Sequence, residues 1–444
     1  MSVGAAGLII AAPASGSGKT CLTLGLLRLL ARRGVAVASA KVGPDYIDPA
    51  FHAAASGRPC LNLDPWAMRP ATLAHAVAAL SVDASLIICE GVMGLFDGAT
   101  ATAGSTADVA AALGWPVVLV VDVRAQAASA AAVVRGFASH RADVDVVGVI
   151  FNRVGSARHA AILSEACAEV LPAMPILGAL PRLDGLCLPE RHLGLVQAGE
   201  HPDLDAFLDR AAALMAEHLD TDALVALARP GPAAGARLPP AAGGPIPHLG
   251  QKIAVAQDAA FAFAYPLTLQ GWRAAGAEIV SFSPLADESP AADADAVYLP
   301  GGYPELHAGL LAGNSRFLQG LRAAAARGAC VFGECGGYMV LGEGLIDASG
   351  CTHAMAGLLP LVTSFAERHL KLGYRHATLL AATRLGAAGM AFRGHEFHYA
   401  TVCSEGAGPA LFACADAAGT SVGTAGRVNG SVAGSFIHLI DRDA

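Results

Sequence analysis

The nine residues APASGSGKT (12–20) stand between an apolar stretch, GLIIAA (7–12), and a helical one, LTLGLLRLL (22–30). A glycine-rich loop that joins a strand to the start of a helix turns its backbone N–H groups toward a bound anion. The pattern is close to G-x-x-x-x-G-K-[ST], although Pro13 stands where the strict pattern has glycine. We therefore predict a phosphate-binding loop rather than an ordinary glycine-rich turn.

Four residues of this loop are expected to bind ATP and its Mg²⁺. Gly16 and Gly18 belong to the part of the backbone that surrounds the phosphates. The ammonium group of Lys19 would reach the β- and γ-phosphates, and Thr20 would place its hydroxyl on Mg²⁺.

Outward from the loop, short apolar strands alternate with helical stretches up to about residue 220. The further strands that we expect are VAVASA (35–40), SLIICE (85–90), PVVLVVD (116–122), DVVGVIFN (145–152) and PILGAL (175–180). Continuous apolar strands between helices are typical of a parallel sheet that is covered on both faces. Residues 1–227 are thus predicted to form an α/β domain, a P-loop ATPase with a parallel sheet.

A stretch dense in Pro, Gly and Ala, residues 228–250, follows and is predicted to be an interdomain linker. A second α/β pattern then fills residues 251–444. Its expected strands are KIAVA (252–256), AEIVSFSP (277–284), DAVYLPGG (295–302) and ACVFGEC (329–335).

Composition excludes several classes of protein. The net charge of -8 argues against a nucleic-acid-binding protein, which usually carries a basic face. No apolar run reaches the ~18 residues that a membrane-spanning helix needs. The 10 cysteines include no CxxC pair, so neither a disulfide framework nor a zinc site is expected. A reduced, cytoplasmic setting follows.

Charged residues follow the second and third expected strands, in KVGPDYIDP (41–49) and CEGVMGLFDG (89–98). The carboxyl ends of parallel strands gather at one edge of a sheet, where ligands bind. Several carboxylates can lie beside a triphosphate only if Mg²⁺ and lysines neutralise them. The residues expected to converge there are Lys19, Thr20, Lys41, Asp45, Asp48, Glu90 and Asp97.

Individual roles are less determined. Glu90 stands where an acid linked to the metal belongs, whereas Asp48 and Asp97 also suit solvated loop positions. Asn152, at the end of a later strand, matches the donor–acceptor edge of adenine but equally suits a turn.

The second half carries a candidate nucleophile, Cys335, in GECGGYMVLGE (333–343). An apolar strand, then cysteine, then a Gly-Gly turn into a helix is the pattern of a nucleophile elbow. The helix N-terminus is expected to lower the thiol pKa, and His438 is the expected base. Backbone N–H groups of Gly302 and Gly336 would form an oxyanion hole. The competing interpretation of Cys335 is one more buried cysteine.

The motifs of the first half resemble a known family. Together, APASGSGKT, KVGPDYIDP, EGVMGLFDG and LPERHLGL (188–195) look like those of the cobyrinic acid and hydrogenobyrinic acid a,c-diamide synthases, whose synthetase domain is similar to dethiobiotin synthetase. The resemblance covers nearly the whole chain. It implies ATP-dependent amidation of the a and c acetate carboxylates of a corrin in cobalamin biosynthesis, through acyl phosphates that ammonia attacks.

The resemblance also suggests roles for single residues. It makes Lys41 a second catalytic lysine, and it implies catalytic roles for Asp48 and Asp97. Asp45 and Tyr46 would contact substrate. The metal ligands would be Thr20, Asp45 and Glu90.

The second half looks like a class I glutamine amidotransferase domain, with a flavodoxin-like fold and L-glutamine as ammonia donor. Most such domains have an acid two residues after the histidine, but this chain has Ile440 there. The sequence therefore leaves open which acid, if any, orients His438. In GHEFHY (394–399), His395, Glu396 and His398 suit either a site or a structural role.

Three alternatives remain at this stage. A P-loop switch ATPase would explain the phosphate loop but would leave Cys335 and His438 without a role. A cobyric acid synthase would amidate other corrin side chains. Between cobalt-containing cobyrinate and metal-free hydrogenobyrinate, SFAERHLKLGYR (364–375) resembles the metal-free branch.

The expected partners are a corrin dicarboxylate, L-glutamine and ATP, without nucleic acid or membrane. A homodimer is one compatible assembly.

Overall fold

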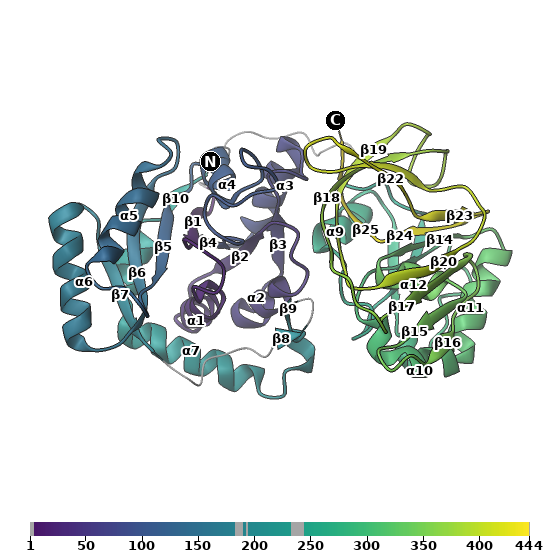
Figure 1. Cartoon of the computed structure of the whole chain (residues 1–444), viewed down its shortest axis with the longest axis horizontal. Helices are drawn as coiled ribbons and strands as arrows, with labels where there is room; N and C mark the ends of the chain where they lie inside the picture. The colour runs from purple at the N-terminus through teal and green to yellow at the C-terminus, as the bar shows by residue number, and fades with distance from the viewer. Residues whose placement is uncertain (1–3, 183–189, 192–193, 232–243, 444) are drawn as a thin grey trace. The chain divides into compact units, whose positions relative to one another are not determined.

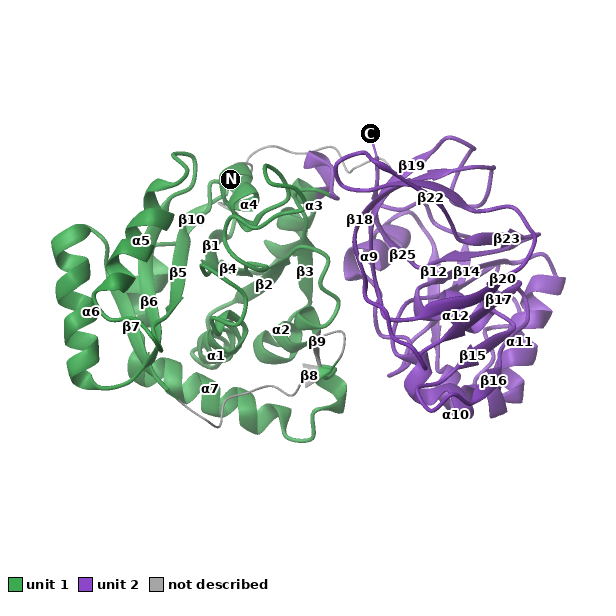
Figure 2. Ribbon diagram, in the orientation of Figure 1, with its two compact units in different colours: residues 1–66, 73–239 green, residues 67–72, 240–444 purple. Residues whose placement is uncertain are grey.

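The computed structural model of the chain describes residues 4–182, 190–191, 194–231 and 244–443 (Figure 1). The chain divides into two compact units, coloured separately in Figure 2. The first comprises residues 1–66 and 73–239, and the second comprises residues 67–72 and 240–444. Each unit is described by itself below.

In the described part of the first unit, eight strands form one sheet in the order β3-β2-β4-β1-β5-β6-β7, with β10 paired to β1. Neighbours along this order are parallel, and β10 is antiparallel to β1. Every residue of β2 and β4 is buried, as expected for a sheet covered on both faces. The strands are β1 (Ala6–Ala11), β2 (Val37–Val42), β3 (Cys60–Leu63), β4 (Leu86–Glu90), β5 (Val117–Asp122), β6 (Val146–Val154), β7 (Ile176–Pro181) and β10 (Arg229–Pro230).

The helices of the first unit follow its strands, and α1 packs against α2 and α7 (Figure 1). Because α1 starts directly after the glycine-rich loop, its N-terminus lies at the carboxyl end of β1. A short pair, β8 (Glu190–Arg191) and β9 (Gly194–Leu195), and a 3₁₀ turn, η1 (Ala198–Glu200), precede α7. The helices are α1 (Lys19–Arg32), α2 (Asp48–Ser56), α3 (Pro70–Leu80), α4 (Thr106–Leu113), α5 (Ser129–Ser139), α6 (Ala157–Val170), α7 (Leu204–His218) and α8 (Thr221–Ala226).

A short segment from the N-terminal half, residues 67–72, is counted with the second unit. Arg69 explains why, because its Nη2 and Nε atoms donate to the two carboxylate oxygens of Asp441 at 2.8 and 3.1 Å. The backbone N–H of Arg69 donates to the same carboxylate at 2.9 Å, and Asp441 is fully buried. The bidentate geometry anchors this segment to the end of the chain.

The central sheet of the second unit has the order β12-β11-β13-β14-β24-β23 in its described residues. The first five strands are parallel, in the 2-1-3-4-5 order of flavodoxin-like folds, and β23 is antiparallel. The strands are β11 (Lys252–Ala256), β12 (Glu278–Phe282), β13 (Ala296–Leu299), β14 (Cys330–Glu334), β23 (Arg427–Asn429) and β24 (Val432–Ser435). The helices are α9 (Pro266–Ala274), α10 (Ala308–Gly313), α11 (Ser315–Ala326) and α12 (Gly336–Leu341), with 3₁₀ turns η2 (Pro284–Ala286) and η3 (Pro304–His307).

Two hydrophobic cores lie on the two faces of this sheet, because alternate residues of β13 belong to different clusters. Val297 and Leu299 pack with α11 and α12, whereas Ala296 and Tyr298 pack with α9 and a second sheet. That second sheet has the order β22-β21-β18-β19-β25, and a smaller one has the order β16-β15-β17-β20. Their strands are β15 (Gly344–Ile346), β16 (Thr352–Ala354), β17 (Leu361–Ser364), β18 (Lys371–Leu379), β19 (Ala391–His398), β20 (Thr401–Glu405), β21 (Phe412–Ala415), β22 (Ser421–Ala425) and β25 (Ile437–Arg442).

The expected α/β class and parallel sheets are confirmed, and the expected strands occur within a few residues of their predicted positions. The sequence analysis did not predict β3, the parallel strand β24 or the strands of the two smaller sheets after residue 344. The segment between the units is narrower than 228–250, since β10 pairs with β1 and Ile246 and Leu249 are buried. The middle of that segment, residues 232–243, lies outside the described residues.

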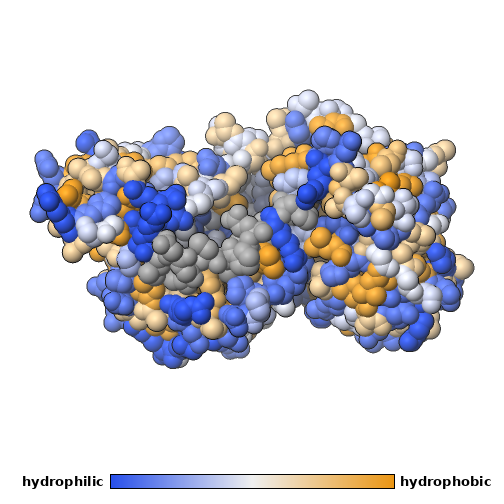
Figure 3. All heavy atoms as spheres, turned by 60° about the horizontal axis from the view of Figure 1, so that its bottom comes forward, coloured by the Kyte–Doolittle hydropathy of each residue, from blue (hydrophilic) through white to orange (hydrophobic). Residues whose placement is uncertain are grey.

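The surface of each unit mixes hydrophilic and hydrophobic residues, with hydrophobic ones in scattered groups on the face that Figure 3 shows. Among the described residues, none of the helices combines the length and the apolar character that crossing a membrane requires.

Gly337, on α12, offers a test of how this helix packs onto the sheet. A β-carbon at Gly337 would lie 2.0 Å from the carbonyl oxygen of Leu299, a backbone atom that has no room to move. We expect Gly337→Ala to destabilise the second unit by about 1–3 kcal/mol, the usual range for overpacking. Gly313→Ala is the control, because a β-carbon there would meet nothing within 4 Å. Urea unfolding measures both, and equal midpoints for the two variants would contradict the prediction.

Candidate active sites

The phosphate-binding loop follows β1, and two residues at the end of β6 form hydrogen bonds with its backbone. Gly16 and Gly18 have φ values of 73° and 89°, which favour glycine. The amide of Asn152 donates to the Ser17 carbonyl at 2.8 Å, and Arg153 Nη1 donates to the Gly16 carbonyl at 2.8 Å. The side chain of Asn152 thus supports the loop. A β-carbon on Gly18 would lie 2.3 Å from the side-chain nitrogen of Asn152, so this contact needs glycine at position 18.

Lys19 is directed at backbone carbonyls in this state. Its Nζ donates to the carbonyl of Met93 at 2.6 Å and to that of Ala14 at 3.4 Å. Burial lowers the pKa of Lys19 to about 8. The Asp97 carboxylate accepts the Gly94 N–H at 2.8 Å, and Asp97 is otherwise exposed. The loop 91–98 therefore meets the phosphate-binding loop through Lys19, and Asp97 shapes the turn.

A buried cluster of charged groups lies beside this loop, centred on Glu90 at the end of β4. Lys41 is the direct neighbour of Glu90 on β2, and its Nζ contacts Glu90 Oε1 at 2.8 Å and Asp48 Oδ2 at 2.6 Å. Thr20 donates its hydroxyl to Glu90 Oε1 at 2.7 Å. The structure thus brings together four of the residues expected to converge: Thr20, Lys41, Asp48 and Glu90.

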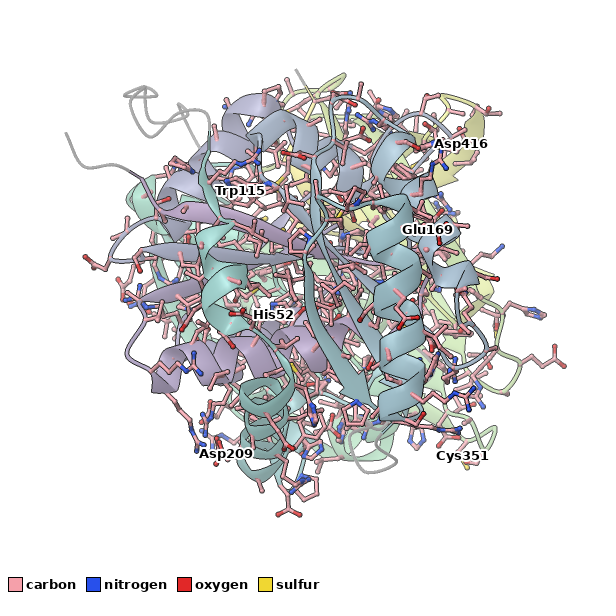
Figure 4. The ribbon with its side chains drawn as sticks, turned by 90° about the vertical axis from the view of Figure 1, so that its left-hand side faces the viewer. His52, Trp115, Glu169, Asp209, Cys351 and Asp416 are labelled. Carbon is pink, nitrogen blue, oxygen red and sulfur yellow. The ribbon has the colours of Figure 1, made fainter. Side chains whose placement is uncertain are left out.

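His52, on α2, completes the cluster and was missed by the sequence analysis. Its Nε2 lies 2.7 Å from Glu90 Oε2, and the residue is fully buried inside the first unit (Figure 4). Its Nδ1 lies 3.7 Å from the Cys60 sulfur. The only signal in the sequence was its position one helical turn after Asp48, which places both on one side of α2.

The electrostatics of the cluster are balanced by these contacts. Burial alone would raise the pKa of Glu90, but Lys41 and His52 hold it well below its ordinary value. Burial would lower the pKa of His52, but Cys60 and Glu90 raise it to about 10. Burial and the nearby Asp45 raise the pKa of Asp48, while Asp48 and Glu90 raise that of Lys41 against its own burial.

Asp45 and Tyr46 lie in the turn that leads into α2. One Asp45 oxygen accepts the backbone N–H groups of Ile47 and Asp48 at 2.8 and 3.0 Å, so the carboxylate closes the turn that leads into the helix. Asn62, on β3, donates to the carbonyls of Gly43 and Asp45 and fixes the same turn. Tyr46 is half-buried. Among the described residues, no group of three His, Cys, Asp or Glu side chains is arranged to hold a metal ion.

In the second unit, Cys335 lies on the tight turn between β14 and α12. Its φ of 48° and ψ of −105° are strained for a non-glycine residue, as in a nucleophile elbow. Its backbone N–H donates to the carbonyl of Ser435 at 2.8 Å. A β-carbon on Gly336 would lie 3.0 Å from the backbone nitrogen of Gly302, so the two expected oxyanion-hole residues are adjacent.

Cys335 and His438 meet at Gly301. A β-carbon on Gly301 would lie 3.0 Å from His438 Nε2 and 3.3 Å from the Cys335 β-carbon, so a side chain there would separate the two residues. Both are buried, and His438 has no exposed surface. Burial raises the pKa of the Cys335 thiol and lowers that of His438, which favours the neutral form of both groups. The expected lowering of the thiol pKa is therefore wrong here, because burial outweighs the helix N-terminus.

The GHEFHY motif lies on β19, which pairs antiparallel with β25. His395 is directly opposite His438, and burial lowers the pKa of His395 to about 4. Glu396 binds Arg375 at 2.7 Å and His398 at 3.0 Å, and the His398 ring stacks on Phe436. Glu396 is thus paired with neighbours on β18 and β19, while His395 and His398 both lie near enough to His438 to lower its pKa, in addition to burial.

A second residue that the sequence analysis missed is Glu334, the residue before Cys335. Tyr298 donates its hydroxyl to Glu334 Oε2 at 2.7 Å, and the Leu439 N–H donates to Glu334 Oε1 at 3.1 Å. Glu334 is buried, and its carboxyl group joins the end of β14, next to Cys335, to the backbone of β25.

His52 provides a direct test of the first cluster. His52→Leu would leave Glu90 Oε2 buried without this partner, and removing one member of a buried ion pair costs about 3–5 kcal/mol. His52→Gln keeps a donor at a similar reach and should lose less. His75, a half-buried histidine on α3, provides the control His75→Leu. Urea unfolding of the full chain gives the free energies, and a His52→Leu variant as stable as the control would refute the assignment.

Comparison with known proteins agrees with this geometry. Residues 8–196 match the model of the CobQ/CobB/MinD/ParA nucleotide binding domain, and residues 252–443 match that of the CobB/CobQ-like glutamine amidotransferase domain. The chain is 57% identical to a hydrogenobyrinate a,c-diamide synthase of Rhizobium meliloti (strain 1021), over 98% of this chain and 99% of that protein. It is 53% identical to the enzyme of that name from Rhodobacter capsulatus, over 99% and 100%. The chain therefore belongs to the hydrogenobyrinate a,c-diamide synthase family, whose members pair a nucleotide-binding domain with a glutamine amidotransferase domain.

Proposed function

We propose that this chain converts the a and c carboxylates of hydrogenobyrinate into amides, using ATP and ammonia from glutamine. One observation carries the proposal. A chain that aligns end to end with relatives of that name holds both a phosphate-binding loop beside a Lys41–Glu90 cluster and a Cys335–His438 pair. We also propose a cytoplasmic location, which fits the nine free cysteines among the described residues.

In the first unit, the substrate carboxylate attacks the γ-phosphorus of ATP and forms an acyl phosphate. The bond between the γ-phosphorus and the β–γ bridging oxygen breaks, and ADP leaves. Lys19 would exchange its contact with the Met93 carbonyl for the triphosphate. Lys41 is positioned by Glu90 and Asp48 to stabilise negative charge on the transferring group. Ammonia then attacks the acyl phosphate, and inorganic phosphate leaves.

Mg²⁺ fits the residues that surround this loop. Thr20 and Glu90 already meet through a hydroxyl–carboxylate contact of 2.7 Å, and nucleotide-bound Mg²⁺ takes only one or two protein ligands. We propose Thr20 and Glu90 as its ligands, with Asp45 as a further candidate. The ion would neutralise the triphosphate. Asp48, Asp97, Tyr46 and Asn152 are proposed to contact or shape the substrate and nucleotide sites.

In the second unit, Cys335 attacks the side-chain amide carbon of glutamine, and His438 takes the thiol proton and passes it to the departing ammonia. The N–H groups of Gly302 and Gly336 would stabilise the oxyanion. Water then hydrolyses the thioester to glutamate.

The division of labour is tested by Cys335→Ser. We expect this variant to lose glutamine-supported amidation and to keep amidation with high ammonium chloride, because the synthetase site needs only ammonia. His438→Ala should show the same split. Cys330→Ser, a buried cysteine at the other end of β14, is the matched control. Amide product is measured by chromatography, and wild-type use of glutamine by Cys335→Ser would disprove the assignment.

The choice of corrin is tested by supplying hydrogenobyrinate and cobyrinate side by side. We expect faster amidation of the metal-free corrin and a final product with two amides, at the a and c positions. Mass spectrometry gives the number of amides added to each corrin. Amidation of other side chains would favour a cobyric acid synthase, and ATP hydrolysis without any amidation would favour a switch ATPase.

A further inference from the structure

Glu334 is a buried carboxyl group that the proposed chemistry does not use. Glu334 is the last residue of β14, one residue before Cys335, and only 4% of its surface is exposed. Each of its two oxygens accepts one hydrogen bond, from the Tyr298 hydroxyl and from the Leu439 N–H. A buried polar group is normally paired in this way, but an apolar residue would fill the position without any need for partners. The carboxyl group therefore calls for a role.

The strands that carry the nucleophile and the base belong to different sheets. β14, which leads to Cys335, pairs with β13 and β24 in the six-stranded sheet. β25, which holds His438, pairs with β19 in the five-stranded sheet. No backbone ladder between β14 and β25 is present in the described residues, but β24, which pairs with β14, leads into β25 through Phe436, and the Cys335 N–H binds the Ser435 carbonyl. A direct contact between the end of β14 and β25 would add to this backbone connection.

The Glu334–Leu439 hydrogen bond provides that contact. Leu439 follows His438, so its N–H is the peptide group that immediately adjoins the histidine. Tyr298, from β13, holds the other oxygen and keeps the carboxyl group directed at β25. At position 440, where many class I glutaminases have an acid, this chain has a buried isoleucine. No carboxylate is therefore available at position 440 to orient the imidazole of His438.

We propose that Glu334 is a positioning residue, which fixes the backbone of His438 relative to Cys335 by binding the Leu439 amide. The inference rests on the proposed glutaminase function of this pair. An acid at position 440 would orient the imidazole of His438 directly. In this chain, Glu334 would do part of that work by holding the backbone next to His438.

The proposal requires a hydrogen-bond acceptor at this place rather than a negative charge. Burial raises the pKa of Glu334 to about 7, so the group is readily protonated near neutral pH. A protonated carboxyl group still accepts the Leu439 N–H through its carbonyl oxygen. Glutamine has the same shape, can accept that N–H and can donate its amide to the Tyr298 oxygen. Glu334→Gln should therefore preserve the geometry that Glu334→Ala removes.

The test measures glutamate release and amidation by the full chain. For Glu334→Ala, kcat of glutamine hydrolysis should fall about 100-fold, the scale of a small misplacement of reacting groups. Its KM for glutamine should stay within about threefold, and amidation with ammonium chloride should be retained. Glu334→Gln should recover kcat to within about threefold of wild type. Glu405→Ala is the control, since Glu405 also accepts a tyrosine hydroxyl but lies on β20.

The outcomes separate this inference from the proposed function. A wild-type chain that releases no glutamate defeats the proposed function itself. An active wild type with equal kcat in Glu334→Ala overturns the inference, as does a loss in Glu334→Gln as large as that in Glu334→Ala. If circular dichroism shows that the alanine variant does not fold, Tyr298→Phe decides. It weakens only the orientation of Glu334, so a several-fold fall in kcat supports the proposal and an unchanged kcat overturns it.

Discussion

The chemistry of the first unit depends on a single buried carboxylate, that of Glu90. One oxygen takes the Thr20 hydroxyl and the Lys41 ammonium, and the other faces His52. An ionised carboxylate without exposed surface is tolerable only with such partners, because an unpaired buried charge is very costly. Glu90 therefore fixes the start of α1, the end of β2 and the side of α2 around one point. Together with Asn152 and Arg153, this cluster fixes the position of the phosphate-binding loop.

The second unit also brings groups from distant parts of the chain together, but it does so with backbone atoms and glycines instead of buried charges. Cys335 and His438 come together only because Gly301, Gly336 and Gly337 leave room for close approach of strand ends and a helix. In the first unit the charged groups lie at the carboxyl ends of parallel strands, where side chains from distant parts of the chain meet. In the second unit Cys335 follows the parallel strand β14, whereas His438 lies on β25, which pairs antiparallel with β19. The difference between the two sites follows from their tasks, since one must hold a polyanion and the other must shelter a neutral thiol and imidazole.

Much of this arrangement could be predicted from the chain itself. The apolar runs before Pro13, Lys41, Glu90 and Cys335 indicated parallel strands, because strands buried on both faces need continuous apolar sequence. The strands after residue 344, most of which pair antiparallel, were not predicted. Strands such as β22, SVGTA, are largely exposed and carry no apolar run. Their pairing is set by distant partners, and a local pattern does not report it.

The sequence by itself determined the two α/β patterns, the phosphate-binding loop, the nucleophile elbow and the residues with suitable chemistry. These depend on spacing along the chain and on backbone preferences of glycine, which are local properties. Only the tertiary structure decided that His52 and Glu334 join the sites, that Asn152 supports the loop, and that His395 faces His438. Hydrogen bonds between residues far apart in sequence form only when strands pair in register, so burial and register choose these partners.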